Sequence, residues 1–280
     1  MRLRCALYRR VESVVRRKIL ETFLNHYRRL PAALAGALLI LITAGCAKQK
    51  DVTQMEPDAA YRYLVQRYNK GDYLSAVDGL DYFTLTYSGS SLVDSAQFLL
   101  AQAHYQLKEY LLAAEAYNEL ARRFPRSPLV PEAMFQAGLS YYKLSPKYSL
   151  DQEQTIKAID ALQGFIDYYP EQAGRVREAQ KLIEECRAKL AHKEFASGVI
   201  YMKMKHYRAA EIYFQLVLDK YYDTEWAAQA AFKLGQALEG EGKKDEAAEA
   251  YRNFLYKYPG HKLKPQAESA LGRIAAAGVK

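Results

Sequence analysis

The sequence predicts an all-α solenoid of about five helix-turn-helix repeats that ends in a C-terminal capping helix. The first observation is a short pattern of alanine and apolar residues that recurs five times, as expected of a repeat architecture. The second is composition, because the 280 residues include only 15 Gly and 9 Pro, which favours long helices over a sandwich or a barrel. The third is that 50% of the residues are hydrophobic, which is enough for a sizeable core.

The first 45 residues have the layout of a secretory signal peptide. Nine basic and two acidic residues precede Cys46, and the apolar run from Ala32 to Ala44 is 13 residues long. A run of this length matches the apolar part of a signal peptide and is short of the about 20 residues that span a bilayer. We therefore predict a signal peptide over residues 1–45, and the alternative is an uncleaved anchor with an incidental cysteine.

The end of this run, Thr43-Ala44-Gly45-Cys46, resembles a bacterial lipobox. In such a motif the thiol takes a diacylglycerol, and the cysteine becomes the new N-terminus after cleavage. Thr43 stands where Leu is usual. The resemblance implies lipidation of Cys46 and a tether over residues 46–57. Because Ala47 and not Asp follows the cysteine, it also implies sorting to the outer membrane, with the folded part in the periplasm.

The basic charge of the chain is concentrated in this N-terminal segment. The formal net charge is +8, but beyond position 45 there are 31 Lys and Arg against 30 Asp and Glu. The folded part therefore has no charge excess that would favour nucleic acid. We expect no nucleic-acid partner.

The recurring pattern is an alanine, an apolar residue four positions later, another seven later and an aromatic residue eleven later. These offsets place all four residues on one stripe of a helix, and a proline after the aromatic residue in three copies ends that helix. Each copy thus marks the second helix of a hairpin. The five copies are Ala76-Leu80-Phe83-Tyr87, Ala113-Tyr117-Leu120-Phe124, Ala158-Leu162-Phe165-Tyr169, Ala210-Phe214-Val217-Tyr221 and Ala247-Tyr251-Phe254-Tyr258.

A small residue precedes the alanine by twelve positions in three copies, where the two helices of a hairpin cross closely. These residues are Ala101, Gly198 and Gly235, and Gly138 holds the matching place in the third copy. Successive alanines are 37, 45, 52 and 37 residues apart, similar to tetratricopeptide repeats of about 34 residues with two insertions. We predict a repeat domain over 58–280, with repeats at about 58–90, 94–127, 131–172, 175–224 and 226–260 and a cap over 263–277.

The two insertions differ in character. The first, Leu144 to Gln154, contains Pro and Ser and is predicted to be an ordered loop. The second lies within Arg175 to Lys203, where apolar residues keep helical spacing, so the first helix of the fourth repeat is predicted to be extended. No flexible linker is visible, which indicates one continuous solenoid.

Two segments carry a resemblance to a known family over about residues 58 to 260. They are Ile159 to Pro170, which reads IDALQGFIDYYP, and Lys189 to Phe195, which reads KLAHKEF. The chain resembles the BamD (ComL/YfiO) family of outer-membrane protein assembly lipoproteins. The resemblance implies a scaffold that holds the central barrel subunit and its accessory lipoproteins and receives unfolded outer-membrane proteins. The alternative is another periplasmic repeat scaffold, such as the Tol–Pal-associated coordinator of cell division, but no coiled-coil heptad precedes Tyr61.

Catalytic chemistry is not expected. The four histidines after Cys46 are widely separated and lack metal-ligand spacing, and no nucleophile elbow or dinucleotide-binding motif occurs. Cys186 is the only other cysteine after Cys46, so it fits a helix core better than a reactive thiol. We predict neither an enzyme nor a cofactor nor a metal site.

The first candidate site is a substrate groove on the concave face, which first-helix positions 5, 9, 12 and 13 line in tetratricopeptide repeats. Position 5 is aromatic in all five repeats, which core packing explains well enough, whereas position 12 is Tyr only in repeats one to three. Tyrosine suits extended peptides with aromatic side chains, and Lys143 could meet a terminal carboxylate. The alternative is half-buried helix packing. The predicted groove residues are Tyr61, Tyr68, Asn69, Phe98, Gln102, Tyr105, Gln106, Phe135, Tyr142 and Lys143.

The second candidate site is a partner-binding surface on the extended helix of repeat four. Its basic residues lie beyond the ordinary footprint of a repeat. Acidic residues lie among them, so a solvated, ion-paired face is the alternative. The predicted partner-binding residues are Arg175, Arg177, Lys181, Arg187 and Lys189.

Overall fold

The computed structural model describes residues 51–278, so the predicted signal peptide and Cys46 lie outside the described residues. The chain divides into two compact units, Met1–Val52 and Thr53–Lys280, and all the α-helices below belong to the second. Over the described range there are eleven α-helices, a short 3-10 helix at Val52–Gln54 and no strand. The prediction of an all-α fold is confirmed.

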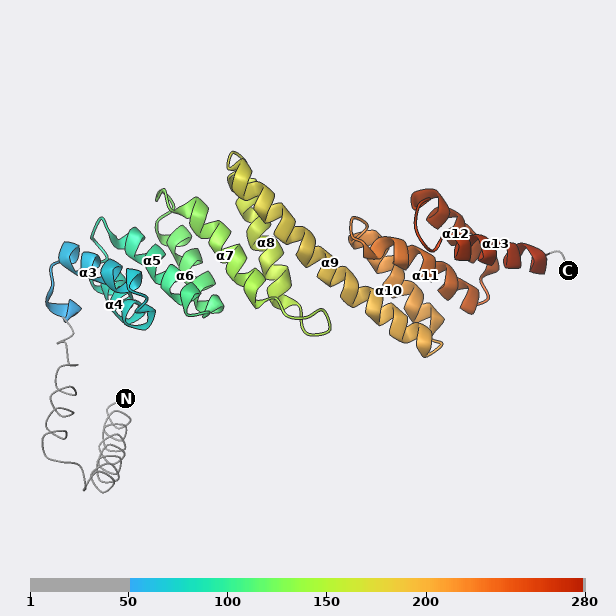
Figure 1. Ribbon diagram of the computed structural model, residues 1–280, viewed down its shortest axis with the longest axis horizontal. Helices are drawn as coiled ribbons and strands as arrows, with labels where there is room; N and C mark the ends of the chain where they lie inside the picture. The colour runs from blue at the N-terminus through green and yellow to red at the C-terminus, as the bar shows by residue number, and fades with distance from the viewer. Residues whose placement is uncertain (1–50, 279–280) are drawn as a thin grey trace, which may run out of the picture. The chain divides into compact units, whose positions relative to one another are not determined.

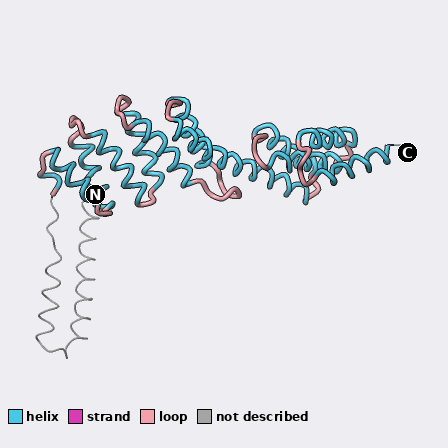
Figure 2. The backbone as a smooth tube through the Cα atoms, turned by 45° about the horizontal axis from the view of Figure 1, so that its top comes forward, coloured by secondary structure: helices cyan, strands magenta, loops and turns pink. Residues whose placement is uncertain are grey.

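The α-helices form five hairpins and a final helix, and consecutive helices lie side by side along the second unit (Figure 1). The connections alternate between two edges of the array (Figure 2). In chain order the helices are α3 (Pro57–Asn69), α4 (Tyr73–Thr86), α5 (Val93–Gln106), α6 (Tyr110–Arg123), α7 (Val130–Leu144), α8 (Glu153–Tyr168), α9 (Ala173–Lys203), α10 (Tyr207–Lys220), α11 (Trp226–Gly240), α12 (Lys244–Lys257) and α13 (Lys264–Gly278). This is a tetratricopeptide-like solenoid.

The recurring pattern of the sequence forms the core. All five repeat alanines are completely buried, and the residues four and seven positions later expose at most 2% of their surface. The aromatic residue eleven positions after each alanine is half-buried and ends the second helix. Its backbone N–H donates a hydrogen bond to the carbonyl four residues before it. A helix stripe with these offsets faces one neighbour along its whole length.

Close helix crossings depend on small residues opposite large ones. A Cβ atom on Gly198 would lie 2.6 Å from Phe214, and one on Gly235 would lie 2.6 Å from Tyr251. In the first repeat the roles are exchanged, because Leu64 stands on the first helix and Gly79 on the second, where a Cβ would lie 2.2 Å from Leu64. These three hairpins therefore have one large side chain at the crossing and one glycine backbone that makes room for it.

The turn between the two helices of a hairpin has the same geometry in four repeats. Gly71, Lys108, Lys205 and Gly242 occupy the same place in the repeat and have φ of 79°, 62°, 61° and 80°. The N–H of the following residue bonds to the carbonyl five residues earlier, as Asp72 does to Arg67 at 3.1 Å and Glu109 to His104 at 3.0 Å. These bonds satisfy carbonyls at the helix end, in a Schellman motif.

Helix α9 is the exception to the repeat length. It has 31 residues, whereas the first helices of the other repeats have 13 to 15, so it is about 46 Å long. It contacts α8 and α10, and also α7 and α11, and Figure 1 shows it running from the third repeat to the fifth. The predicted extension is present, and the predicted loop before α8 is held against it.

Candidate functional site

The predicted groove tyrosines lie in the last turns of the first helices of repeats one to three. Tyr68 on α3 contacts Tyr73 edge to face at 5.2 Å between ring centroids, and Tyr105 on α5 contacts Tyr110 in the same way at 5.1 Å. Burial raises the pKa of both phenols, so they stay protonated and can donate hydrogen bonds. Both rings are half-buried, which leaves part of each face open to a ligand.

Tyr142, the third member of this row, is engaged by the extended helix. Its hydroxyl donates a hydrogen bond to Glu185 on α9, and this bond is the main reason that its pKa is raised to about 12. Lys143, the next residue, is exposed. The row is therefore bounded on one side by α9, which the sequence pattern did not indicate.

The aromatic residues at position 5 pack inside their own repeats. Tyr61 lies 6.0 Å from Phe83, Phe98 lies 5.5 Å from Tyr117, and Phe135 lies 5.6 Å from Phe165. Phe135 is completely buried, so it has no surface to offer a peptide, whereas Tyr61 and Phe98 keep some exposure. The surface available to a ligand in these repeats is therefore made by position 12 and its polar neighbours.

The polar members of the predicted groove accompany the tyrosines. Asn69 and Gln106 are exposed and Gln102 is half-buried. The side chain of Gln106, in the second repeat, lowers the pKa of Tyr68 and so partly opposes the rise that burial causes. Aromatic faces and amide groups lie next to one another here, as they do in many peptide-binding surfaces.

Three of the five predicted partner-binding residues make contacts within the protein. Arg175 binds Glu132 at 2.8 Å and Glu178 at 2.9 Å, and its guanidinium lies 4.5 Å from the centroid of the Phe135 ring. Arg187 binds both carboxylate oxygens of Asp223, at 2.7 and 2.9 Å. Arg175 fastens α9 to the third repeat, and Arg187 fastens it to the connection between α10 and α11.

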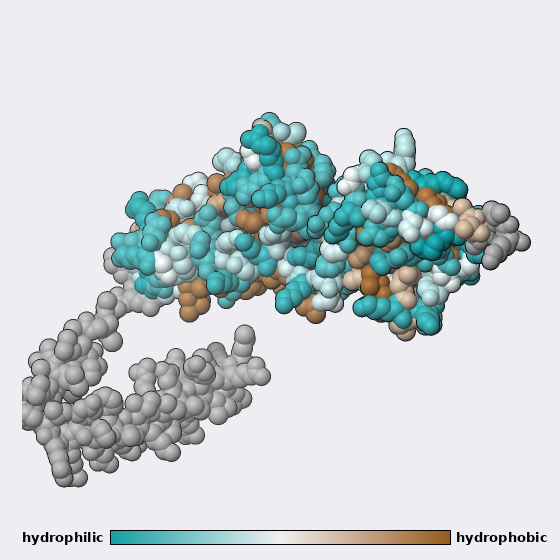
Figure 3. Space-filling model, turned by 45° about the vertical axis from the view of Figure 1, so that its right-hand side comes forward, coloured by the Kyte–Doolittle hydropathy of each residue, from teal (hydrophilic) through white to brown (hydrophobic). Residues whose placement is uncertain are grey.

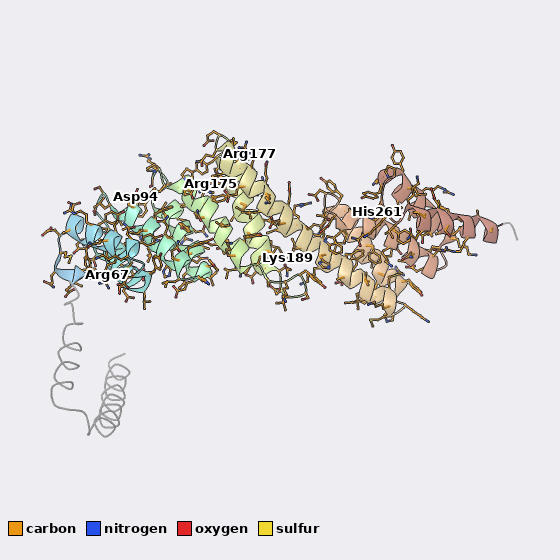
Figure 4. All side chains as sticks on the ribbon, viewed as in Figure 1. Arg67, Asp94, Arg175, Arg177, Lys189 and His261 are labelled. Carbon is orange, nitrogen blue, oxygen red and sulfur yellow. The ribbon has the colours of Figure 1, made fainter. Side chains whose placement is uncertain are left out.

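Lys189 has a similar structural role. Its Nζ lies 2.5 Å from Ser145 Oγ, and the Nζ of Lys193 lies 2.8 Å from the Leu150 carbonyl, so α9 holds the loop before α8 through two lysines. Arg177 and Lys181 are exposed and form no ion pair with any residue of the described range. Figure 4 shows Arg175 and Arg177 near the start of α9 and Lys189 near its middle.

Sequence reasoning missed a stack of three rings at the middle of α9. The ring of His192 lies between Tyr148 and Trp226, at centroid distances of 3.6 and 3.9 Å. Burial lowers the pKa of His192, and Glu225 partly opposes this shift. The stack forms part of a groove of about 530 Å³ that Lys147, Lys189 and Glu225 also line. The only signal in the sequence was that His192 lies in one of the two segments that carry the family resemblance.

Within residues 51–278 no group of three or more His, Cys, Asp or Glu side chains is placed to hold a metal ion. Cys186 is completely buried, and burial raises the pKa of its thiol to about 11, which makes it a poor nucleophile. None of the helices of the described range is both long and apolar enough to cross a membrane.

Comparison with known proteins gives a family and named relatives. The model of the YfiO family, described as outer membrane lipoprotein, matches residues 53–253. The chain is 26% identical over 233 residues to the outer membrane protein assembly factor BamD of Rickettsia prowazekii, which covers 82% of this chain and 92% of that protein. It is 25% identical over 243 residues to BamD of Caulobacter vibrioides, covering 85% and 79%. Among solved structures, the TPR2AB domain of yeast Sti1 aligns at a TM-score of 0.38 and 16% identity, covering 79% and 86%.

Proposed function

The chain belongs to the YfiO family of outer membrane lipoproteins, and from this membership we propose that it is a non-enzymatic assembly factor for outer-membrane β-barrel proteins. The observation that carries the proposal is the family match, supported by two relatives named BamD that align over more than three quarters of their own length. Its partners in this proposal are the central barrel subunit, its accessory lipoproteins and unfolded barrel proteins.

Co-purification from membranes tests this assignment. The full chain, tagged at its C-terminus and extracted in mild detergent, is expected to bring down a central barrel protein of the outer membrane. Recovery of cell-division proteins without that barrel protein would contradict the proposal and favour the role of a division coordinator.

A lipid anchor at Cys46, with the repeats facing the periplasm, is part of the proposal. The lipobox-like ending supports it, together with the description of the family as lipoproteins. Intact-mass analysis of the membrane-extracted protein is expected to show a chain that begins at Cys46 and carries acyl groups. A Cys46→Ala variant is expected to lose both features, and an unmodified Cys46 in the parent would refute the anchor.

We place the binding of substrate segments at the tyrosine row of repeats one to three. Tyr68 and Tyr105 offer half-exposed rings beside Asn69 and Gln106, and Lys143 supplies an exposed ammonium group for a terminal carboxylate. Such a surface suits the aromatic, carboxylate-terminated last strand that outer-membrane barrels commonly carry. Main-chain and aromatic contacts would give the affinity, and the lysine would set the direction.

A double variant tests this surface. Tyr68→Ala with Tyr105→Ala is expected to weaken binding of a C-terminal barrel peptide roughly tenfold or more, as loss of aromatic anchors does. The matched control is Tyr222→Ala with Tyr256→Ala, because these tyrosines are 70% and 86% exposed and lie elsewhere. A folded Tyr68/Tyr105 variant, checked by circular dichroism, that binds as well as the control would place the groove elsewhere.

For the partner surface of α9, we propose Arg177 and Lys181 as the residues that remain available to another protein. Reversing Arg175, Arg187 or Lys189 would break contacts within the protein, so their variants would not separate folding from binding. Arg177→Glu with Lys181→Glu avoids this problem. Reduced co-purification of the barrel subunit is expected, and unchanged recovery would assign these residues to a solvated face.

A further inference from the structure

The edge of the array at the hairpin turns combines exposed aliphatic side chains with lysines. We call this edge the turn edge and define it by three pairs, one in each of the first three repeats: Lys70 with Leu74, Lys108 with Leu111, and Lys147 with Leu150. The three leucines are 64%, 47% and 57% exposed, and the three lysines are exposed as well. A leucine beside a lysine thus recurs at each successive turn.

The repeat structure explains why these pairs share one edge. The turns between α3 and α4, between α5 and α6, and between α7 and α8 all lie along the lower edge in Figure 1. Leu74 and Leu111 are the second residues of α4 and α6, and Lys108 is the residue with φ of 62° in its turn. The fourth turn continues the edge with Met204, which is 55% exposed, and Lys205. Figure 3 shows hydrophobic groups protruding along the lower margin among hydrophilic ones.

The lysines of the turn edge are not neutralised within the protein. In the described part of the chain no carboxylate forms an ion pair with Lys70, Lys108 or Lys147, whereas Asp72 binds Arg67 at 2.5 Å and Glu109 binds His104 at 2.8 Å. The fifth turn is different, because Lys243 is paired with Glu211 and Glu241 at 2.9 and 3.0 Å. At the first three turns, unpaired lysines therefore lie beside exposed aliphatic groups.

The opposite edge carries acidic residues at the helix starts of the same repeats. The first helices start there, and the first turns of α3, α5 and α7 carry Asp58, Asp94 and Glu132. Acidic residues stabilise helix N-termini, but Glu132 is paired with Arg175 and Asp94 accepts a hydrogen bond from Ser127. Arg126 and Arg177 are exposed on this edge, so the two edges differ in the recurring pair of lysine and leucine and not in the sign of their charge.

We infer that the turn edge of repeats one to four rests on an anionic phospholipid bilayer, with its lysines at the headgroups and its aliphatic side chains among them. Basic residues interleaved with exposed apolar ones are typical of protein surfaces that lie at a membrane interface. This inference rests on the lipid anchor of the proposed function, to which it adds a second point of attachment.

The covalent chain permits this contact. Ten residues separate Cys46 from Pro57, where α3 begins, and a chain of that length reaches at most about 35 Å. Helix α3 has 13 residues and is about 20 Å long. An anchor at Cys46 therefore keeps the first repeat near the bilayer and still allows either of its edges to face the lipid, so that the recurring pair of lysine and leucine is what favours the turn edge.

A fluorescent label at each end of one helix tests the inference. The acylated mature product is reconstituted into phosphatidylethanolamine vesicles, with and without phosphatidylglycerol, with a label on Leu74→Cys or on Leu85→Cys. Both positions are on α4 and are 64% and 77% exposed, but eleven residues separate them, about 16 Å along the helix. Cys186 is completely buried and so does not compete for the label. In the acylated product Cys5 has been removed with the signal peptide and the thiol of Cys46 is blocked by its lipid.

The emission of the label at position 74 is expected to shift to the blue and to be quenched by brominated lipids, more strongly when phosphatidylglycerol is present. The label at position 85 is expected to show neither effect. Lys70→Glu, Lys108→Glu and Lys147→Glu together are expected to reduce the quenching at position 74 by roughly tenfold or more. The matched control is the triple variant Lys220→Glu, Lys257→Glu and Lys262→Glu. It changes the net charge by the same amount, at exposed positions on the other edge.

Equal quenching at positions 74 and 85, quenching at neither, or quenching that ignores the lysine reversals would overturn the inference. The inference would also be overturned if the emission of the label at position 74 changed only on addition of the barrel subunit in detergent, without lipid. The turn edge would then be a protein interface. The vesicles contain no other protein, so failure to co-purify the barrel subunit would refute the proposed function without affecting this result.

Discussion

At the scale of single residues, the hairpin turns show how the repeats tolerate variation at a strained position. Four turns need one residue with positive φ, and Gly71 and Gly242 meet the need without a Cβ, whereas Lys108 and Lys205 adopt the same conformation at a steric cost. In all four turns the N–H of this residue bonds to the carbonyl three residues earlier, and the next N–H bonds to the carbonyl five residues earlier. Hydrogen bonding at the helix end therefore determines the backbone conformation of the turn. The residue type determines only how much conformational free energy the positive φ costs.

Replacing Gly71 by Ala is expected to destabilise the protein by about 1 kcal/mol, because the left-handed conformation is unfavourable for a residue with a Cβ. Gly164→Ala, inside α8, is the control and is expected to stabilise by about 0.5–1 kcal/mol, since alanine restricts the unfolded chain and favours helix. A Cβ meets nothing within 4 Å at either site. Urea unfolding measures both changes, and equal signs for the two variants would contradict this account.

The stacked His192 predicts a dependence of stability on pH. Burial lowers its pKa in the folded protein, so the folded state binds the proton less tightly than the unfolded state does, and stability falls as the pH drops below the unfolded value of about 6.5. His192→Phe keeps a flat ring between Tyr148 and Trp226 but cannot take up a proton. The parent is expected to lose more stability than this variant between about pH 7 and pH 5, and parallel losses would show that other groups are responsible.

At the scale of helices, the hairpin crossing is the feature that packing controls most tightly. Gly235→Ala would place a Cβ 2.6 Å from a ring atom of Tyr251, so α11 and α12 must move apart. We expect a loss of about 1–3 kcal/mol, the usual effect of overpacking. Gly272→Ala in the neighbouring α13 has free space around it and is expected to be neutral or slightly stabilising. A Gly235→Ala variant as stable as Gly272→Ala in thermal unfolding would mean that the crossing is loose.

The helices and the core of the repeats could be predicted from sequence because their signal is periodic. Offsets of 4, 7 and 11 report which stripe of a helix is buried, and every residue so identified in the first three places of the pattern lies in the core. The contacts between long side chains of different elements have no such period. Arg175 and Glu132 are 43 positions apart in the sequence, and so are Tyr142 and Glu185. Neither pair could therefore be found from a repeating spacing.

The candidate site was harder to predict than the fold for the same reason. Position 12 of the repeat identified Tyr68 and Tyr105, which lie where an alignment of repeats would put them. Position 5 identified residues that pack inside the repeat, with Phe135 completely buried. The stack of Tyr148, His192 and Trp226 needs a loop, the extended helix and the start of α11 together, and only three-dimensional packing brings these segments into contact.

At the scale of the whole described array, most contacts join a helix to its neighbours in sequence. Stability in such an array is local, since each repeat depends on the repeats beside it. The final helix α13 covers the last hairpin, where its buried residues Ala267 and Ala270 join the core that contains Tyr251 and Phe254. The open end of the array is thus closed by a single helix.

Removing α13 is expected to have a local effect. A chain that ends after His261 would expose part of that core, so amide hydrogen exchange is expected to become faster in α11 and α12 and to stay unchanged in α3 to α8. Mass spectrometry of peptic fragments measures both regions in one sample. Faster exchange throughout the chain would show that the array unfolds as a single cooperative unit.

The length of α9 also restricts how this array can evolve. Repeat proteins gain and lose units when a gene segment of one repeat is duplicated or deleted, which preserves the fold because each hairpin meets similar neighbours. Helix α9 instead contacts α7 and α11 as well as the adjoining helices, and through Arg175 and Arg187 it holds side chains of the third repeat and of the connection that leads to the fifth. Loss or duplication of the fourth unit would leave those partners unmatched, so changes in repeat number are expected to be tolerated away from this unit and not at it.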